Sequence, residues 1–237
     1  MSMLEDATKW DDARRLEAFA GEARVNRIRV AAIVVFYARH MVDVYVQRGN
    51  AAVQGYHTKV TLIVLAWALF SAYLHWMLVR RRVDPALKYV AVVWDLVMVT
   101  LLAMAGGING GAKSPLVLLY FVIVASASLR LDLGLVWTAT LGAMAGYCLV
   151  LMYYAWGLIG WNNYYAPENA GLRIPRSTEG IFLLALGAAG LMAGQVVRQA
   201  RRLVAGYPAF LHLIRLAVAD TATNTVLVEV SVKSNLA

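Results

Sequence analysis

The chain has 237 residues, of which 61% are hydrophobic and only 15% are charged, and its formal net charge is +8. Average soluble domains are roughly half apolar and about a quarter charged, so this composition excludes an ordinary soluble domain and predicts an integral membrane protein. No basic surface interleaved with aromatic residues accompanies the positive charge. We therefore expect no nucleic-acid partner and attribute the charge to topology and to contact with anionic lipid.

Apolar windows near the roughly 20 residues that a helix needs to cross a bilayer follow one another along the chain. They cover residues 28–46, 60–79, 87–105, 115–131, 134–158 and 180–197. The predicted fold is an all-α integral membrane bundle of six transmembrane helices over residues 27–203. A cytoplasmic interfacial helix (1–26) is expected before the bundle and a cytoplasmic docking tail (204–237) after it.

Basic residues fall unevenly on the two sides of these alternating spans. One side receives Arg24, Arg27, Arg29, Arg80, Arg81, Arg82, Lys88, Arg198, Arg201 and Arg202, and the other receives Arg48, Lys59, Lys113, Arg173 and Arg176. The positive-inside rule then places both termini in the cytoplasm. A multi-pass protein of a bacterial cytoplasmic (inner) membrane is the expected location.

The first span contains the densest group of polar residues, Arg39, His40 and Asp43. Charged side chains inside a bilayer are costly unless they pair or face a wet interior. Arg39 and Asp43 are four residues apart and can pair along one helical face. We favour a self-neutralised pair packed against other helices; the alternative is a polar pocket for a headgroup, a quinone or a proton.

Further polar residues lie in the second and third spans. His75 in the second span and Asp95 in the third have similar estimated depths, so they are candidates to meet across a helix interface, where a His–carboxylate pair can titrate or orient a ligand. The histidines are too scattered, and Cys148 too isolated, to predict a metal or haem site. Small residues at helix-packing spacing predict close helix contacts at Gly142, Gly146, Gly187, Gly190 and Gly194.

The third and fourth spans are joined by "GGINGGAKSPLVLLYFVIVASASL". Its glycines permit positive φ angles, and Pro115 suits the first turn of the next helix. This stretch resembles the loop between the third and fourth helices in the six-helix input modules of bacterial sensor histidine kinases, among them the redox-responsive RegB/PrrB type. Gly106, Gly107, Asn109 and Pro115 match that pattern. The resemblance implies a loop associated with quinone sensing, so quinone or lipid is the expected ligand if one is bound.

Nothing in the sequence predicts an enzyme. It has no glycine-rich phosphate loop, nucleophile arrangement or metal cluster, and the residues after the sixth span are too few for a kinase transmitter. The tail instead contains "TVLVEVSVK", in which Val226, Val228, Val230 and Val232 alternate with other residues, as in a β-strand. A single strand needs a sheet edge, so these valines are predicted to dock on a partner.

Two functions fit these observations. The first, which we prefer from sequence, is a non-catalytic accessory subunit of a larger membrane complex, with other integral membrane subunits and lipids as partners. A respiratory or photosynthetic complex is a conjectural host. The second is a stand-alone sensory input module, responsive to a redox signal, a quinone or another lipophilic ligand, that signals to a separate transmitter.

Overall fold

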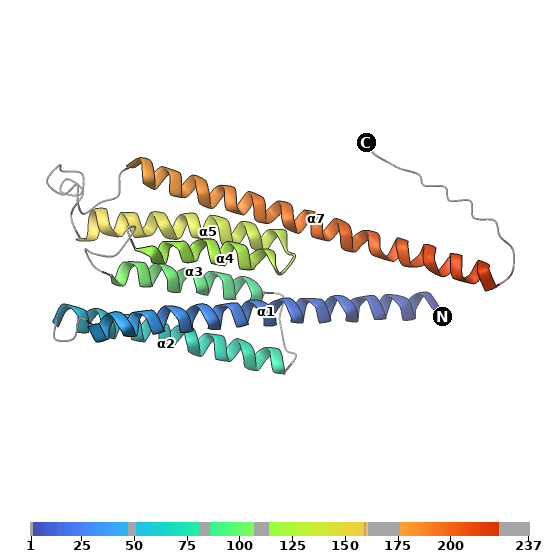
Figure 1. Cartoon of the computed structure of the whole chain (residues 1–237), viewed down its shortest axis with the longest axis horizontal. Coiled ribbons are helices and arrows are strands. Elements are labelled where there is room, and N and C mark those ends of the chain that lie inside the picture. The colour runs from blue at the N-terminus through green and yellow to red at the C-terminus, as the bar shows by residue number, and fades with distance from the viewer. Residues whose placement is uncertain are drawn as a thin grey trace. The chain divides into compact units, whose positions relative to one another are not determined.

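A computed structural model of the chain describes residues 2–46, 51–80, 86–106, 114–158, 160 and 176–222. These residues form six α-helices and, within the described ranges, no strand (Figure 1). The chain divides into two units, residues 1–197 and residues 198–237. The first unit contains α1 to α5 and the start of α7, and the described part of the second is the remainder of α7.

The helices follow the apolar windows of the sequence. Their bounds are Ser2–Val46 for α1, Ala51–Val79 for α2, Leu87–Ala105 for α3, Leu119–Ser128 for α4, Leu133–Met152 for α5 and Arg176–Ala222 for α7. A 3-10 turn, η3 (Pro115–Leu118), leads into α4, and a π-helical turn, η4 (Tyr153–Leu158), continues α5. The protein is therefore all-α.

Four stretches are long and apolar enough to cross a membrane: Gly55–Val79, Leu87–Ala105, Leu133–Gly157 and Thr178–Leu203. A chain with several such helices is a multi-pass membrane protein. The other two of the six predicted windows also form helices, but they differ from these four in charge or in length. The apolar part of α1 carries three charged residues, Arg29, Arg39 and Asp43, and the fourth window is a shorter apolar helix, Pro115–Ser128.

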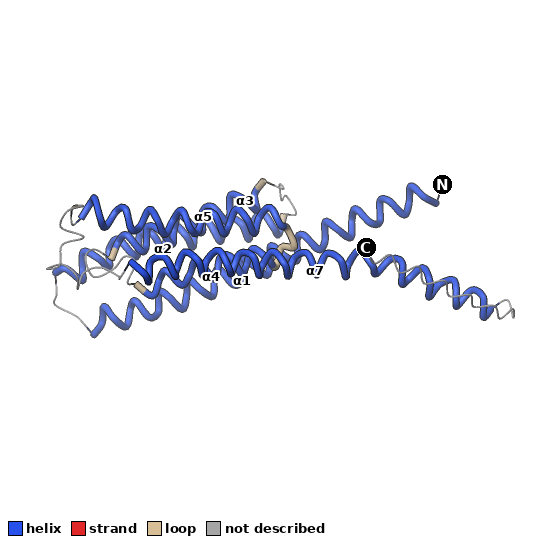
Figure 2. Tube along the Cα trace, turned by 90° about the horizontal axis from the view of Figure 1, so that it is seen from above, coloured by secondary structure: helices blue, strands red, loops and turns tan. Residues whose placement is uncertain are grey.

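The centre of the first unit is α3. It packs against α2, α4 and α5, whereas α1 packs against α2 and α4 (Figures 1 and 2). Half of the apolar window of α3 is buried inside the protein, against 22% for α2 and for α7. Val99, Leu102, Leu135 and Val136 are fully buried where α3 meets α5. Many apolar side chains on the outer helices are exposed, among them Val35 on α1, Leu69 on α2 and Leu184 on α7, as expected of a surface that faces lipid.

The glycines predicted to pack helices behave in three ways. A Cβ on Gly146 would lie 2.8 Å from Thr100 Oγ1, one on Gly142 2.4 Å from Leu96 Cδ1, and one on Gly190 2.3 Å from Thr140 Oγ1. These three glycines therefore permit close helix approach. A Cβ on Gly194 would make an ordinary contact with Leu133 at 3.4 Å, and one on Gly187 would meet nothing within 4 Å.

Two expected boundaries fall inside continuous helices. α1 passes residue 26 without a break, and Asn26 itself is buried. α7 likewise passes the expected boundary between residues 203 and 204, continues through Pro208 and ends at Ala222. The predicted strand with Val226, Val228, Val230 and Val232 lies outside the described residues.

Candidate functional site

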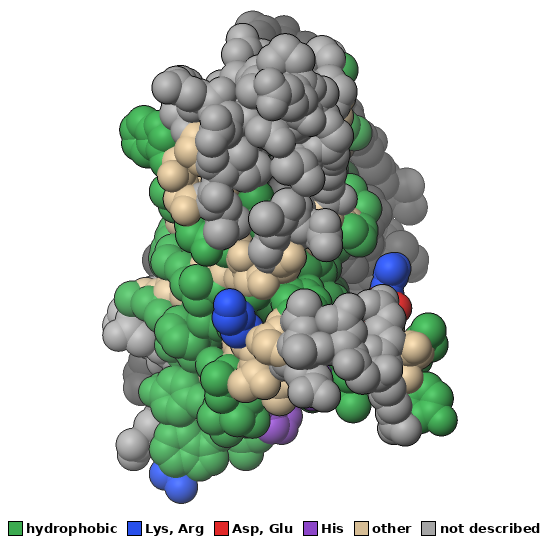
Figure 3. All heavy atoms as spheres, turned by 90° about the vertical axis from the view of Figure 1, so that its left-hand side faces the viewer, with side chains coloured by type: hydrophobic (Ala, Val, Ile, Leu, Met, Phe, Trp, Pro, Cys, Tyr) green, Lys and Arg blue, Asp and Glu red, His purple; other side chains and the backbone are tan. Residues whose placement is uncertain are grey.

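A cavity of about 370 Å³ opens at the end of the first unit where α1 ends and α2 and η3 begin. Its lining comes from α1 (Phe36, Arg39, His40, Asp43, Val44), from α2 (Tyr56) and from the segment that starts α4 (Ser114, Pro115, Leu116, Leu119). Figure 3 looks at this end and shows hydrophobic side chains around a histidine and basic groups. The structure thus brings the polar group of the first span to Pro115 of the glycine-containing loop.

Local sequence explains why these side chains converge. On α1 the lining residues recur every three or four positions, which places them on one helical face. On the opposite wall, Ser114 is the N-cap of η3, and its hydroxyl accepts a hydrogen bond from Leu116 N at 3.3 Å. Pro115 occupies the first turn, where its missing N–H costs nothing. This cap fixes the beginning of the helix against the cavity.

His40 is the buried polar group of the cavity. His40 is only 5% exposed, and its Nε2 lies 3.1 Å from Nδ1 of His57 on α2. Phe36 stacks on the imidazole at 6.4 Å between ring centroids, and Tyr56 meets it edge-on at 5.4 Å. A hydrogen bond between two ring nitrogens requires one to donate and the other to accept, so one N–H proton lies between the two rings. His40 is thereby held in an aromatic enclosure that suits a planar or hydrogen-bonding ligand.

A polar chain continues behind the histidine pair. Thr61 Oγ1 lies 3.5 Å from His57 Nδ1 and 3.3 Å from the hydroxyl of Tyr37. These contacts join α1 to α2 and orient His57. His57 is not among the site residues predicted from sequence. The spacing of four residues between His57 and Thr61 is the signal that indicates a shared helical face.

Arg39 and Asp43 lie at the mouth of the cavity. Their contact is a single approach of 3.8 Å between Arg39 Nε and Asp43 Oδ2, and the side chains are 72% and 56% exposed. The pair therefore forms on one face of α1 but does not pack into the core, which differs from the sealed arrangement favoured from sequence. Both side chains are available to a ligand in the cavity.

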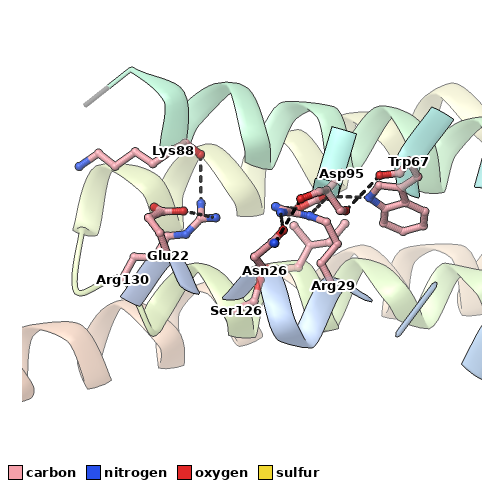
Figure 4. Close-up of polar contacts among 10 residues, drawn as sticks. Glu22, Asn26, Arg29, Trp67, Lys88, Asp95, Ser126 and Arg130 are labelled. Atoms are coloured by element: carbon pink, nitrogen blue, oxygen red, sulfur yellow. Dashed lines mark hydrogen bonds and ion pairs between the residues drawn. The ribbon is translucent and has the colours of Figure 1, made fainter. Parts of the chain in front are cut away.

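A second polar cluster lies in the interior of the first unit (Figure 4). Arg29 donates from Nε to Asp95 Oδ1 at 2.6 Å and from Nη2 to Asp95 Oδ2 at 2.7 Å. Trp67 Nε1 donates to the same carboxylate at 2.8 Å. Arg29 Nη1 also donates to Asn26 Oδ1 at 2.8 Å, and Asn26 Nδ2 donates to the carbonyl of Ser71 at 3.3 Å. Every helix of the trio α1, α2 and α3 contributes to this network.

The predicted meeting of His75 with Asp95 is wrong. Asp95 is engaged by Arg29 and Trp67, whereas His75 is exposed on α2. From sequence, Arg29 belongs to the basic flank of the first span, because its charge contributes to the topology. A better signal is the spacing of Glu22, Asn26 and Arg29, which places three polar side chains on one face of α1.

A further pair of contacts joins α1 and α3 to the turn between α4 and α5. Arg130 Nη2 lies 2.9 Å from Glu22 Oε2, and Arg130 Nη1 donates to the carbonyl of Lys88 at 3.0 Å. Burial raises the pKa of the Glu22 carboxyl, although the charge of Arg130 opposes that shift.

Lys88 itself pairs with Asp132, which also caps α5 by accepting a hydrogen bond from Gly134 N. Burial of the Asp132 carboxyl acts to raise its pKa, but the hydrogen bond and charge of Lys88, together with backbone hydrogen bonds from Leu135 and Gly134, outweigh burial and leave the pKa lowered. Together with the Arg130 contacts, these pairs fix the α4–α5 turn against α1 and α3.

Of the loop residues in the sequence pattern, Gly106 ends α3 with an ordinary right-handed φ of −67°. It therefore does not use the positive φ that glycine allows. Gly107 and Asn109 lie outside the described residues. Among the described residues no group of three or more His, Cys, Asp or Glu side chains is arranged to hold a metal ion.

No protein-family model, curated protein or solved structure matches the chain. No family is identified, and the resemblance to sensor-kinase input modules stays a prediction from the residues quoted for it.

Proposed function

We propose that the chain is a non-catalytic, multi-pass input module of a bacterial inner membrane that binds a small amphiphilic ligand in the cavity beside His40 and signals to a separate partner. The observation that carries the proposal is the cavity itself, which unites the polar residues of α1 with Pro115 at the start of η3. A volume of about 370 Å³ is within the usual range for small-molecule sites.

The chemistry of the lining supports binding rather than catalysis. Phe36, Tyr56 and Leu119 supply apolar and aromatic surface. His40, which contacts His57 through Nε2, adds a polar imidazole to the same lining. Apolar walls with a few oriented polar groups are the common make-up of ligand pockets. A quinone or a lipid headgroup has the matching combination of ring or chain and polar oxygen.

α1 connects the cavity to the interior polar cluster. The same helix contributes Phe36 to Val44 to the cavity and Arg29 to the bidentate pair with Asp95. Arg29 and Phe36 are seven residues apart, a distance of about 10 Å along a helix. Because a helix moves as a rigid rod over such a distance, a ligand that tilts α1 also alters the contacts of Arg29 and Glu22.

The test uses the full chain purified in detergent and titrated with a decyl-substituted benzoquinone and with a short-chain phospholipid. Saturable binding, followed by intrinsic tryptophan fluorescence and thermal stabilisation, is expected for at least one of the two. His40→Ala should weaken that binding about tenfold or more, since a buried hydrogen bond is lost. His75→Ala removes an exposed histidine from α2 and is the matched control.

Two results contradict the proposal: neither compound binds, or His40→Ala and His75→Ala bind alike. The accessory-subunit hypothesis depends on the tail at 204–237 and stays a prediction. Co-purification of the full-length and tail-deleted chains from native membranes tests it, because a docked tail predicts loss of partners on deletion.

A further inference from the structure

We propose that the ligand of the cavity is a zwitterionic amphiphile of the phosphoethanolamine type, whose phosphate contacts Arg39 and whose primary ammonium contacts Asp43. This inference rests on the proposed function and specifies the ligand class. The apolar part of such a ligand lies against Phe36, Leu116 and Leu119, which line the same cavity.

Two Arg–Asp pairs of different character involve α1. Arg29 and Asp95 form a closed pair, with two contacts of 2.6 and 2.7 Å and side chains 2% and 8% exposed. Arg39 and Asp43 make one contact of 3.8 Å and are largely exposed at the cavity. Most hydrogen-bonding positions of Arg29 and Asp95 are taken up within the protein. The Arg39–Asp43 pair keeps most of its hydrogen-bonding capacity, because a guanidinium has five N–H donors and a carboxylate about four acceptor positions.

The spacing of the open pair suits a ligand with two charges of opposite sign. Residues i and i+4 are separated by about 6 Å along a helix, so a positive and a negative group stand side by side at the mouth. A phosphate joined to an ammonium by a two-carbon bridge presents the complementary order of charges. Charge-assisted hydrogen bonds of this kind are among the strongest available to proteins.

Among the described lining residues, Arg39 and Asp43 are the only Lys, Arg, Asp or Glu side chains. The imidazole of His40 contacts His57 through Nε2. A purely anionic headgroup would meet Arg39 but be repelled by Asp43. A neutral quinone would contact His40 but would bring no charged group to Arg39 or Asp43. The zwitterion is the class that uses all the polar groups at the mouth.

The experiment measures dissociation constants of the full chain in detergent by native mass spectrometry. The probes are dihexanoyl phosphatidylethanolamine, the matching phosphatidylglycerol and phosphatidylcholine, chain-free glycerophosphoethanolamine, and decyl-benzoquinone. Phosphatidylethanolamine should bind about tenfold or more tightly than phosphatidylglycerol, because one charged hydrogen bond distinguishes them. If glycerophosphoethanolamine binds as tightly as phosphatidylethanolamine, the ligand is a soluble molecule. If phosphatidylethanolamine binds and glycerophosphoethanolamine does not, the ligand is a membrane lipid.

Variants assign the contacts. Asp43→Asn should remove the preference for phosphatidylethanolamine over phosphatidylglycerol, and Arg39→Gln should weaken both lipids. Arg27→Gln, at an exposed position of α1 that does not line the cavity, should change neither. Even if a variant fails to fold, the affinities of the unmodified chain for phosphatidylethanolamine and phosphatidylglycerol still test the proposed ligand class.

Equal affinity for the two lipids, or an undiminished preference in Asp43→Asn, overturns the inference. If decyl-benzoquinone binds through His40 in that case, the proposed function survives with a different ligand class. If no probe binds, the proposed function fails as well.

Discussion

At the scale of single residues, the interior of the first unit depends on how its charges are compensated. Arg29 and Asp95 are almost fully buried, and the carboxylate accepts hydrogen bonds from Arg29 on α1 and from Trp67 on α2. Desolvating two charges costs several kcal/mol per ion, and the mutual attraction recovers that cost only with good geometry. Two short hydrogen bonds and a third from Trp67 meet this requirement. The pair therefore specifies how α1 sits on α3 more than it adds net stability.

Removing one member of this pair should be far more harmful than removing both. Asp95→Ala leaves the Arg29 guanidinium buried without its counter-ion and should lower the free energy of unfolding by about 3–5 kcal/mol. The double variant Arg29→Met/Asp95→Leu replaces the pair with apolar groups and should recover most of that loss. Unfolding of the purified chain in detergent measures both. Asp43→Ala is the control, because its exposed pair with Arg39 contributes at most about 1 kcal/mol.

If Asp95→Ala unfolds no more easily than Asp43→Ala, the pair is not the structural contact described. A double variant as unstable as the single one would instead show that the polar network around Asn26 and Trp67 depends on the charges themselves.

At the scale of helices, the apolar windows of the sequence correspond to helices in the structure, because hydrophobic length alone predicts a span. The inward face of α1 could not be predicted in the same way. Hydropathy counts Arg29 as a charge, without regard to the partner on α3 that compensates it. His40 and Pro115 were singled out separately, but their common cavity depends on the packing of α1 against α2 and α4.

The glycines of α7 illustrate the same limit. Gly187 and Gly190 are both small residues at packing spacing, yet a Cβ on Gly190 would lie 2.3 Å from Thr140 Oγ1 and one on Gly187 would meet nothing within 4 Å. The sequence cannot separate them, because the rotation of α7 about its axis is set by its neighbours.

These two glycines give a matched pair of variants. Gly190→Ala should lower the free energy of unfolding by about 1–3 kcal/mol, the usual cost of overpacking. Gly187→Ala should be neutral or stabilising by up to about 1 kcal/mol, because alanine favours the helix. Thermal unfolding in detergent compares them, and Thr140→Ala should partly rescue Gly190→Ala by removing Oγ1 and Cγ2. Equal stability of the two glycine variants would contradict the close contact of α5 and α7 at this point.

At the scale of the whole molecule, the charges at its two ends predict how the protein lies in its membrane. The two ends of the first unit differ in chemistry. One has the ion pairs of Glu22 with Arg130 and of Lys88 with Asp132, and the other has the cavity beside His40. The basic residues counted for topology are concentrated on the side of Lys88. If that side faces the cytoplasm, the cavity opens toward the outer face, where a lipid or a lipophilic ligand of the outer leaflet can enter.

The positive-inside rule predicts that both termini are cytoplasmic and that the cavity end is external. In a Cys148→Ser background, which removes the exposed native thiol, cysteines at Ser2 and Ser234 should resist a membrane-impermeant thiol reagent in intact cells and react after lysis. A cysteine at Lys113, between α3 and η3, should react in intact cells and serves as the positive control. An even number of crossings is required for both termini to share a side, so labelling of only one terminus would show that α1 or α4 does not cross. Labelling of both termini with protection of Lys113 would reverse the orientation and place the cavity on the cytoplasmic side.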